Sequence, residues 1–234
     1  DLIYGLPGQT LEEWHDDLRN CLSLNPQHFS LYSLGMEEGT PFFNWVEKGL
    51  ISTPDPDLMA DMYDFSTNLL SDHNFACYEI SNFYLEKPEI DFRSTHNMQY
   101  WRNLPYLGLG AGAHGFTGNL RYMNYKSVPD YMKAVSGMEI HDNRLLSPAV
   151  QNMSKIDHKM AMQETMMLGL RMVEEGVDRN QFRERFAVDP MAYFSKEIQS
   201  LIRKQLIEIT EKGNICLTRK ARFVGNQAFI EFID

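Results

Sequence analysis

Hydrophobic positions in the first part of the chain switch between short apolar runs and helical spacing. Residues 1–6 form an apolar run that predicts a buried strand entering a turn. Apolar residues then recur at helical spacing over about 11–22, after Thr10 and Glu13, which match a capping box. A second apolar run covers about 28–34. The order strand, helix, strand predicts a βαβ unit with parallel strands and a right-handed crossover.

The middle of the chain continues with shorter elements and clear caps. Pro residues at first helical positions and glycines at stops place the boundaries. The pattern predicts helices over about 40–48 and 55–70, a strand over 77–80, a charge-rich loop, a hairpin of 113–117 with 119–124, and a helix over 127–135.

In the last third of the chain, the predicted helices come first and a small hairpin follows. The pattern predicts a long helix over about 154–175 ended by Gly176, helices opening at Asp178 and at Asp189, a hairpin of 207–209 with 215–217, and a final helix from Thr218 to Ile230. Helices followed by a two-stranded wing is the order of a winged-helix domain.

Charge is divided unevenly along the chain. Residues 1–150 hold 9 Lys and Arg against 20 Asp and Glu, whereas residues 151–234 hold 13 against 12. The change suggests two domains, 1–150 and 151–234, and neither is basic enough for a strong nucleic-acid footprint. The sequence has no apolar run of membrane-spanning length and three widely spaced cysteines, which is typical of a cytoplasmic protein with core thiols.

The segment His96-Asn97-Met98-Gln99-Tyr100-Trp101 is a candidate for chemistry. A histidine beside aromatic rings offers an axial nitrogen and flat faces to an iron tetrapyrrole. The alternative is a surface helix in which His96 caps a backbone group while Tyr100 and Trp101 pack into the core. Taken by itself, the segment favours that structural interpretation.

A glycine run at 108–115 has four glycines in eight residues. Its backbone, at Gly110, Ala111 and Gly112, could form a wall against a nucleoside or methionine moiety of a cofactor. It is not a dinucleotide-binding fingerprint, because no helix of suitable length follows it. The run could equally be a tight bend between strands. Asp1, at the head of a strand, is either a ligand for a ribose diol or a solvated strand end.

Four segments together resemble one known family. Residues 1–10 (Asp-Leu-Ile-Tyr-Gly-Leu-Pro-Gly-Gln-Thr), 78–83 (Tyr-Glu-Ile-Ser-Asn-Phe), 96–101 and the glycine run resemble the oxygen-independent coproporphyrinogen III oxidase-like family of radical S-adenosylmethionine (SAM) proteins. Residues 168–171 resemble that family's C-terminal domain. The resemblance implies an α/β fold: the C-terminal half of a partial (β/α) barrel followed by a small helical winged-helix-like domain.

The family holds a [4Fe-4S] cluster on a C-x3-C-x2-C loop, a spacing that this sequence lacks. The resemblance therefore implies that the chain is a C-terminal portion, inert by itself in radical chemistry. It also implies that Asp1 contacts the SAM ribose and Ile3 the adenine, with Tyr32 and Leu34 lining the same pocket. The pattern His-Asn-x-x-Tyr-Trp is typical of the heme-chaperone (HemW-like) branch, which assigns His96 to heme iron and Asn97, Tyr100 and Trp101 to the heme.

Three functions follow as hypotheses. The first is a heme chaperone that binds heme and delivers it to an acceptor protein. The second is a true oxidase that decarboxylates two propionates of coproporphyrinogen III. The third, from another class, is a nucleic-acid-binding winged helix, against which the nearly neutral charge of residues 151–234 counts.

Overall fold

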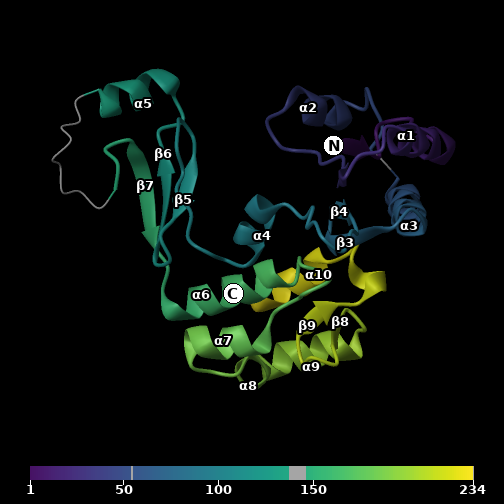
Figure 1. Cartoon of the computed structure of the whole chain (residues 1–234). Helices are drawn as coiled ribbons and strands as arrows, with labels where there is room; N and C mark the ends of the chain where they lie inside the picture. The colour runs from purple at the N-terminus through teal and green to yellow at the C-terminus, as the bar shows by residue number, and fades with distance from the viewer. Residues whose placement is uncertain (54, 137–145, 234) are drawn as a thin grey trace.

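Three sheets are joined by helices in the part of the chain that the computed structural model describes, residues 1–53, 55–136 and 146–233 (Figure 1). A four-stranded sheet lies near the N-terminus, a three-stranded sheet follows, and a two-stranded hairpin belongs to the C-terminal helices.

The N-terminal sheet confirms the βαβ unit. Strands β1 (Leu2–Tyr4) and β2 (His28–Ser33) pair in parallel, and α1 (Leu11–Ser23) crosses between them. Helix α1 begins at Thr10, whose side chain accepts the N–H of Glu13 while the Glu13 carboxylate accepts the N–H of Thr10. This capping box satisfies two backbone donors that a helix start otherwise leaves open.

One strand of this sheet was not predicted. Strand β4 (Asn82–Leu85) falls in the expected loop, yet it pairs antiparallel with both β2 and β3 (Phe75–Glu79). The sheet order is therefore β1-β2-β4-β3. The four residues of β4 are too few for an alternation signal, and pairing on both sides compensates for their weak local preference.

A hydrophobic core forms between this sheet and the helices that cover one of its faces. Trp14 and Leu18 of α1 are buried against the sheet and against α3 (Pro56–Asp72). The indole N–H of Trp14 donates to Ser66 of α3 at 2.8 Å. Helix α2 (Pro41–Glu47) begins at Thr40 and ends before Gly49, as predicted.

The second sheet confirms one prediction and corrects another. Strands β5 (His114–Phe116) and β6 (Leu120–Asn124) form the predicted hairpin, and α5 (Val128–Val135) follows. Strand β7 (Val150–Lys155) then pairs with β6 where the start of a long helix was expected. Residues 151–155 are exposed, so this edge strand leaves no apolar alternation in the sequence.

The predicted helix over 154–175 is wrong at both ends. Helix α6 (His158–Gly169) starts after its cap Asp157 and stops at Gly169. A Cβ on Gly169 would lie 2.8 Å from Val177, so the chain turns where the two segments approach most closely. Gly176, the expected helix stop, instead has φ +63° in the turn before the Val177–Ile215 bridge.

The C-terminal helices and hairpin have the predicted winged-helix order. The elements are α7 (Arg179–Phe186), α8 (Pro190–Tyr193), α9 (Ser195–Arg203), β8 (Ile207–Ile209) and β9 (Ile215–Leu217). The single helix expected from Asp189 is two, because Phe194 leaves helical geometry and buries its ring against Phe182 and Phe232.

The predicted final helix is also divided into short pieces. These are η1 (Arg219–Ala221), α10 (Asn226–Phe229) and η2 (Ile230–Phe232). The turn at Gly225 packs on Phe229 and Leu217, with the nearest Phe229 atom 3.0 Å from a Cβ built there. Phe116 of β5 joins the core of these C-terminal helices, so the domain boundary near residue 150 stays a prediction. Within the described ranges, no helix is long and apolar enough to cross a membrane.

Candidate functional site

The four residues predicted to bind SAM lie along β1 and β2. Ile3 and Tyr32 are direct register partners of the parallel pair, so their side chains leave the same face of the sheet. Ile3 is 51% exposed and Tyr32 is 43% exposed, whereas Tyr4, which points to the other face, is buried. Asp1 is exposed two residues before Ile3, and Leu34 is half-buried two residues after Tyr32. This open face can accept a flat apolar ring beside a carboxylate.

A buried tyrosine, Tyr78 of β3, connects this sheet to helix α4 (Thr95–Trp101). Its hydroxyl lies 2.9 Å from Nε2 of His28 and accepts the backbone N–H of Ser94 at 3.1 Å. The side chain of Asn97 also hydrogen-bonds this hydroxyl. Burial raises the pKa of Tyr78 above its ordinary value and lowers that of His28. A neutral imidazole whose proton is on Nδ1 accepts the Tyr78 hydroxyl proton at Nε2.

Helix α4 divides the four predicted heme residues between two faces. His96 and Tyr100 are four residues apart and share one face, where their ring centroids are 4.8 Å apart in an edge arrangement. Tyr100 also contacts Tyr106, with centroids 4.5 Å apart. Asn97 and Trp101 share the neighbouring face, so the structure does not bring all four side chains to one ligand.

The His96 imidazole is exposed, and among the described residues no hydrogen bond holds either of its nitrogens. Two of the other described histidines are hydrogen-bonded: His28 contacts Tyr78, and His73 contacts the carbonyl of Leu69. Close to α4 in the chain, Leu107 is 75% exposed and Leu109 is 85% exposed. The available imidazole of His96 and the rings of Tyr100 and Tyr106 form what we call the His96 face.

Trp101 lies in different surroundings. The Arg171 guanidinium lies 5.1 Å from the centre of the Trp101 ring and 4.5 Å from that of Phe229. Burial lowers the pKa of Arg171, while the nearby carboxylate of Glu79 opposes this shift. The indole Nε1 of Trp101 is buried, and no partner for it is present in the described chain.

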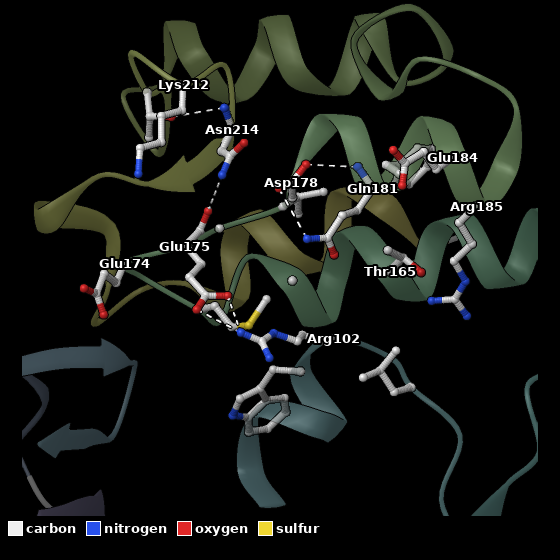
Figure 2. Close-up of a pocket in the computed structure, with 18 of the residues that line it drawn as sticks. Arg102, Thr165, Glu174, Glu175, Asp178, Gln181, Glu184, Arg185, Lys212 and Asn214 are labelled. Carbon is white, nitrogen blue, oxygen red and sulfur yellow. Dashed lines mark hydrogen bonds and ion pairs between the residues drawn. The ribbon is translucent and has the colours of Figure 1, made fainter. Parts of the chain in front are cut away.

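Trp101 and Arg102 line a groove of about 1400 Å³ between α4 and the C-terminal helices. Figure 2 shows Arg102 pointing toward Glu175, with Asp178, Gln181 and Asn214 farther along the wall. Arg102 and Arg93 both pair with Glu175, at 2.8 Å and 3.0 Å. The described lining mixes both signs of charge and includes no histidine, so the groove is distinct from the His96 face.

Comparison with known proteins now adds to this geometry. Residues 156–224 match the family model described as HemN C-terminal domain. The chain is 35% identical over its full length to the heme chaperone HemW of Lactococcus lactis and 33% identical to that of Bacillus subtilis. It covers 57% and 58% of those two proteins, so it spans little more than half the length of its curated relatives. The chain belongs to the HemW-like radical SAM family.

More distant relatives agree with this assignment. The mouse mitochondrial radical S-adenosyl methionine domain-containing protein 1 is 33% identical over 92% of the chain and 48% of its own length. The structure titled coproporphyrinogen III oxidase (HemN) from Escherichia coli superposes with a TM-score of 0.72 at 18% identity, covering 99% of this chain and 54% of that one. This likeness shows that the HemW-like chain has the HemN radical SAM fold.

In the glycine run of this HemW-like chain, several backbone N–H and C=O groups already make hydrogen bonds within the protein. The N–H of Gly108 donates to the Tyr122 hydroxyl, and that of Gly110 donates to the Tyr131 hydroxyl. Asn124 donates to the carbonyls of both glycines, and the N–H of Gly112 donates to Tyr125. A backbone wall that hydrogen-bonds a nucleoside or methionine moiety needs free N–H groups. These contacts favour the tight bend over the predicted cofactor wall at Gly110, Ala111 and Gly112.

The cysteines do not fit a metal cluster. Across the described ranges, no group of three or more His, Cys, Asp or Glu side chains is placed to hold a metal. Burial raises the pKa of Cys77 to about 12 and that of Cys216 to about 11, so both thiols stay protonated at neutral pH. Thiolates are the form that ligates iron. Radical SAM relatives imply a [4Fe-4S] cluster, and the residues present do not hold it.

Sequence reasoning missed the buried polar residues that connect these parts. Tyr78 and Glu79 belong to one of the family motifs, but the sequence predicted no contact for either side chain. Glu79 is 3% exposed and accepts from the Asn82 side chain and from the Ser81 N–H. Their signal is a tyrosine and a glutamate within a strand whose neighbours are apolar, since such groups need buried partners.

Proposed function

We propose that the protein containing this chain is a heme chaperone that binds heme through His96 and passes it to an acceptor protein. The observation that carries this proposal is the exposed imidazole of His96, whose nitrogens make no hydrogen bond to described residues. An axial ligand must offer a nitrogen lone pair that is not already engaged. The relatives named heme chaperone HemW support heme as the bound molecule.

The surroundings of His96 suit a flat, apolar ligand. The Tyr100 ring stands in an edge arrangement with the imidazole and with the Tyr106 ring, and aromatic rings favour contact with a porphyrin face. Leu107 and Leu109 supply exposed apolar surface that heme would cover. Trp101 and Asn97 lie on the neighbouring face of α4 and support the helix instead of touching heme. An open site of this kind favours transfer, because the bound heme stays within reach of an acceptor.

The sheet face beside α4 is proposed as the SAM site. The Asp1 carboxylate would accept ribose hydroxyls, Ile3 would pack on the adenine, and Tyr32 and Leu34 would close the apolar side. A [4Fe-4S] cluster, held by cysteines outside the described residues, would supply the electron for reductive SAM cleavage. Tyr78 fixes α4 to the same sheet, so the two proposed sites share one rigid support.

A hemin titration followed by absorbance tests the heme site. The full-length protein is compared with His96→Ala and with His114→Ala, an exposed histidine of β5 that serves as the matched control. We expect a Soret shift that saturates near one equivalent in the parent and the control. His96→Ala should weaken binding by about tenfold or more, the value of one lost strong ligand contact. Added imidazole should restore the spectrum of His96→Gly.

Unchanged affinity and spectrum in His96→Ala would show that the iron ligand is another residue. A second assay separates the chaperone from an oxidase. The full-length protein, with its cluster rebuilt under anaerobic conditions, is incubated with SAM and coproporphyrinogen III. We expect SAM cleavage without loss of the propionate carboxylates, and formation of protoporphyrinogen would overturn the chaperone proposal.

A further inference from the structure

A second, smaller cavity lies where the N-terminal sheet meets the HemN C-terminal domain. Its volume is about 260 Å³. One wall comes from the ends of β1 and β2 and the β3–β4 turn, with Ser33 and Ser81. The other wall comes from the C-terminal domain, with Arg171, Arg222 and Asn226. None of these residues belongs to the proposed heme or SAM site.

The cavity wall carries more positive than negative charge. Arg171 faces the buried carboxylate of Glu79, which supplies it with a counter-charge. Arg222 makes no ion pair with any residue that the structure describes, and its neighbours are Tyr63, Cys77 and Cys216. Burial raises the pKa of all three neighbours, so they remain neutral at neutral pH. A half-buried guanidinium among neutral groups lacks the partner that such a charge requires.

Hydrogen-bond donors on this wall are also unused. The Nε atoms of Arg171 and Arg222 are both buried, and neither has a partner in the described residues. The Tyr63 hydroxyl is occupied, since it donates to the carbonyl of Ile80 at 3.1 Å. Ser81 and Asn226 line the same space and add a hydroxyl and an amide donor. Donors and cations therefore converge on one cavity, whose described lining includes no carboxylate.

The geometry points to a binding site for a small oxyanion, a phosphate or a short carboxylate, held between Arg222 and Arg171. Guanidinium groups bind such anions through charge-assisted, often bidentate hydrogen bonds. The cavity is smaller than the roughly 300–1,000 Å³ of sites for drug-sized ligands, so heme does not fit. Because the walls come from both parts of the chain, a bound anion ties the sheet to the C-terminal domain.

Calorimetric titration and thermal unfolding of the full-length protein test this site. Inorganic phosphate and malonate are the two probes, and sodium chloride at equal ionic strength is the reference. We expect at least one probe to bind with saturation and to raise the Tm above the chloride value. Arg222→Gln should weaken binding by about tenfold to a hundredfold, as expected for one charge-assisted contact. The matched control Arg203→Gln, on the exposed side of α9, should bind as the parent does.

The two probes decide which oxyanion the site prefers. Ser81→Ala provides a milder second variant in case Arg222→Gln does not fold, and it should weaken binding without abolishing it. Heme binding at His96 should be unchanged in Arg222→Gln, so this test and the test of the heme site fail independently. Absence of saturable binding by both probes, or equal binding by the parent and Arg222→Gln, would overturn the proposal and leave a cavity filled by water.

Discussion

Nε2 of His28 lies 2.9 Å from the hydroxyl oxygen of Tyr78, and this contact joins β2 to β3 although β4 lies between them in the sheet. The same hydroxyl accepts the N–H of Ser94, the residue that caps α4. One phenol therefore fixes the start of the helix that carries His96. The position of the proposed heme ligand depends on a polar contact inside the sheet.

Replacing Tyr78 by phenylalanine tests this dependence. The ring still fills its space, but His28 and the Ser94 N–H lose their shared partner. We expect the free energy of unfolding, measured with urea, to fall by about 1–3 kcal/mol, the usual cost of leaving buried polar groups unsatisfied. Hemin affinity should also fall, because α4 loses its anchor.

Tyr193→Phe is the matched control for Tyr78→Phe. Tyr193 is 46% exposed on α8, and its change should stay within about 0.5 kcal/mol. Equal effects of the two substitutions would show that the Tyr78 hydroxyl does not hold the helix.

The depressed pKa of His28 predicts a pH dependence of stability. Burial lowers this pKa below the ordinary 6.5, so just below pH 6.5 the unfolded chain binds more protons than the folded one. The contribution of His28 to stability is therefore fully present above about pH 6.5 and is lost as the pH falls.

We expect the free energy of unfolding of His28→Gln to fall less than that of the parent when the pH is lowered from 7 to below the folded-state pKa of His28. Urea unfolding of both proteins at several pH values measures the difference. Parallel curves for the two proteins would show that His28 titrates alike in the folded and unfolded states.

The sequence predicted helix starts and strand pairing correctly where nearby residues alone determine the backbone conformation. The helices expected from about residues 11, 55 and 127 begin at the caps Thr10, Asp55 and Ser127, because a short polar side chain bonds the helix start within three residues. The parallel pairing of β1 and β2 followed from the length of the crossover between them. These predictions needed no information about distant contacts.

Contacts between distant segments explain what was missed. Strands β4 and β7 form because neighbouring strands supply their hydrogen bonds. The helix breaks at Phe194 because the Phe194 ring packs against two other aromatic rings. The Trp101 ring is covered by Arg171, which lies 70 positions farther along the chain. A pattern of six residues cannot reveal that partner.

The glycine run should respond to substitution as a structural bend. A Cβ on Gly108 would lie 2.2 Å from the carbonyl oxygen of His114, so backbone has to move. A Cβ on Gly110 meets nothing within 4 Å, but its φ of +101° strains any other residue. We expect Gly110→Ala to cost about 1–2 kcal/mol and Gly108→Ala more, measured by urea unfolding.

Ligand binding separates the two interpretations of the same run. With its N–H bonded to Tyr131, Gly110 is a bend residue, and Gly110→Ala should leave hemin and SAM affinity unchanged. A large loss of SAM affinity in a Gly110→Ala protein of near-normal stability would show that the glycine run contacts the cofactor.

Trp101 provides the last test, because it lies on α4 but faces away from His96. Trp101→Phe keeps a ring beneath Arg171 and removes a buried N–H that has no described partner, so the cost should stay within about 1 kcal/mol. Trp101→Ala removes the ring and should cost about 2–4 kcal/mol, since Trp101 is half-buried. In both variants the Soret spectrum of bound heme should match the parent, in contrast to His96→Ala. A changed spectrum in Trp101→Phe would mean that heme lies in the groove that Trp101 and Arg102 line, and the assignment of the His96 face would then be wrong.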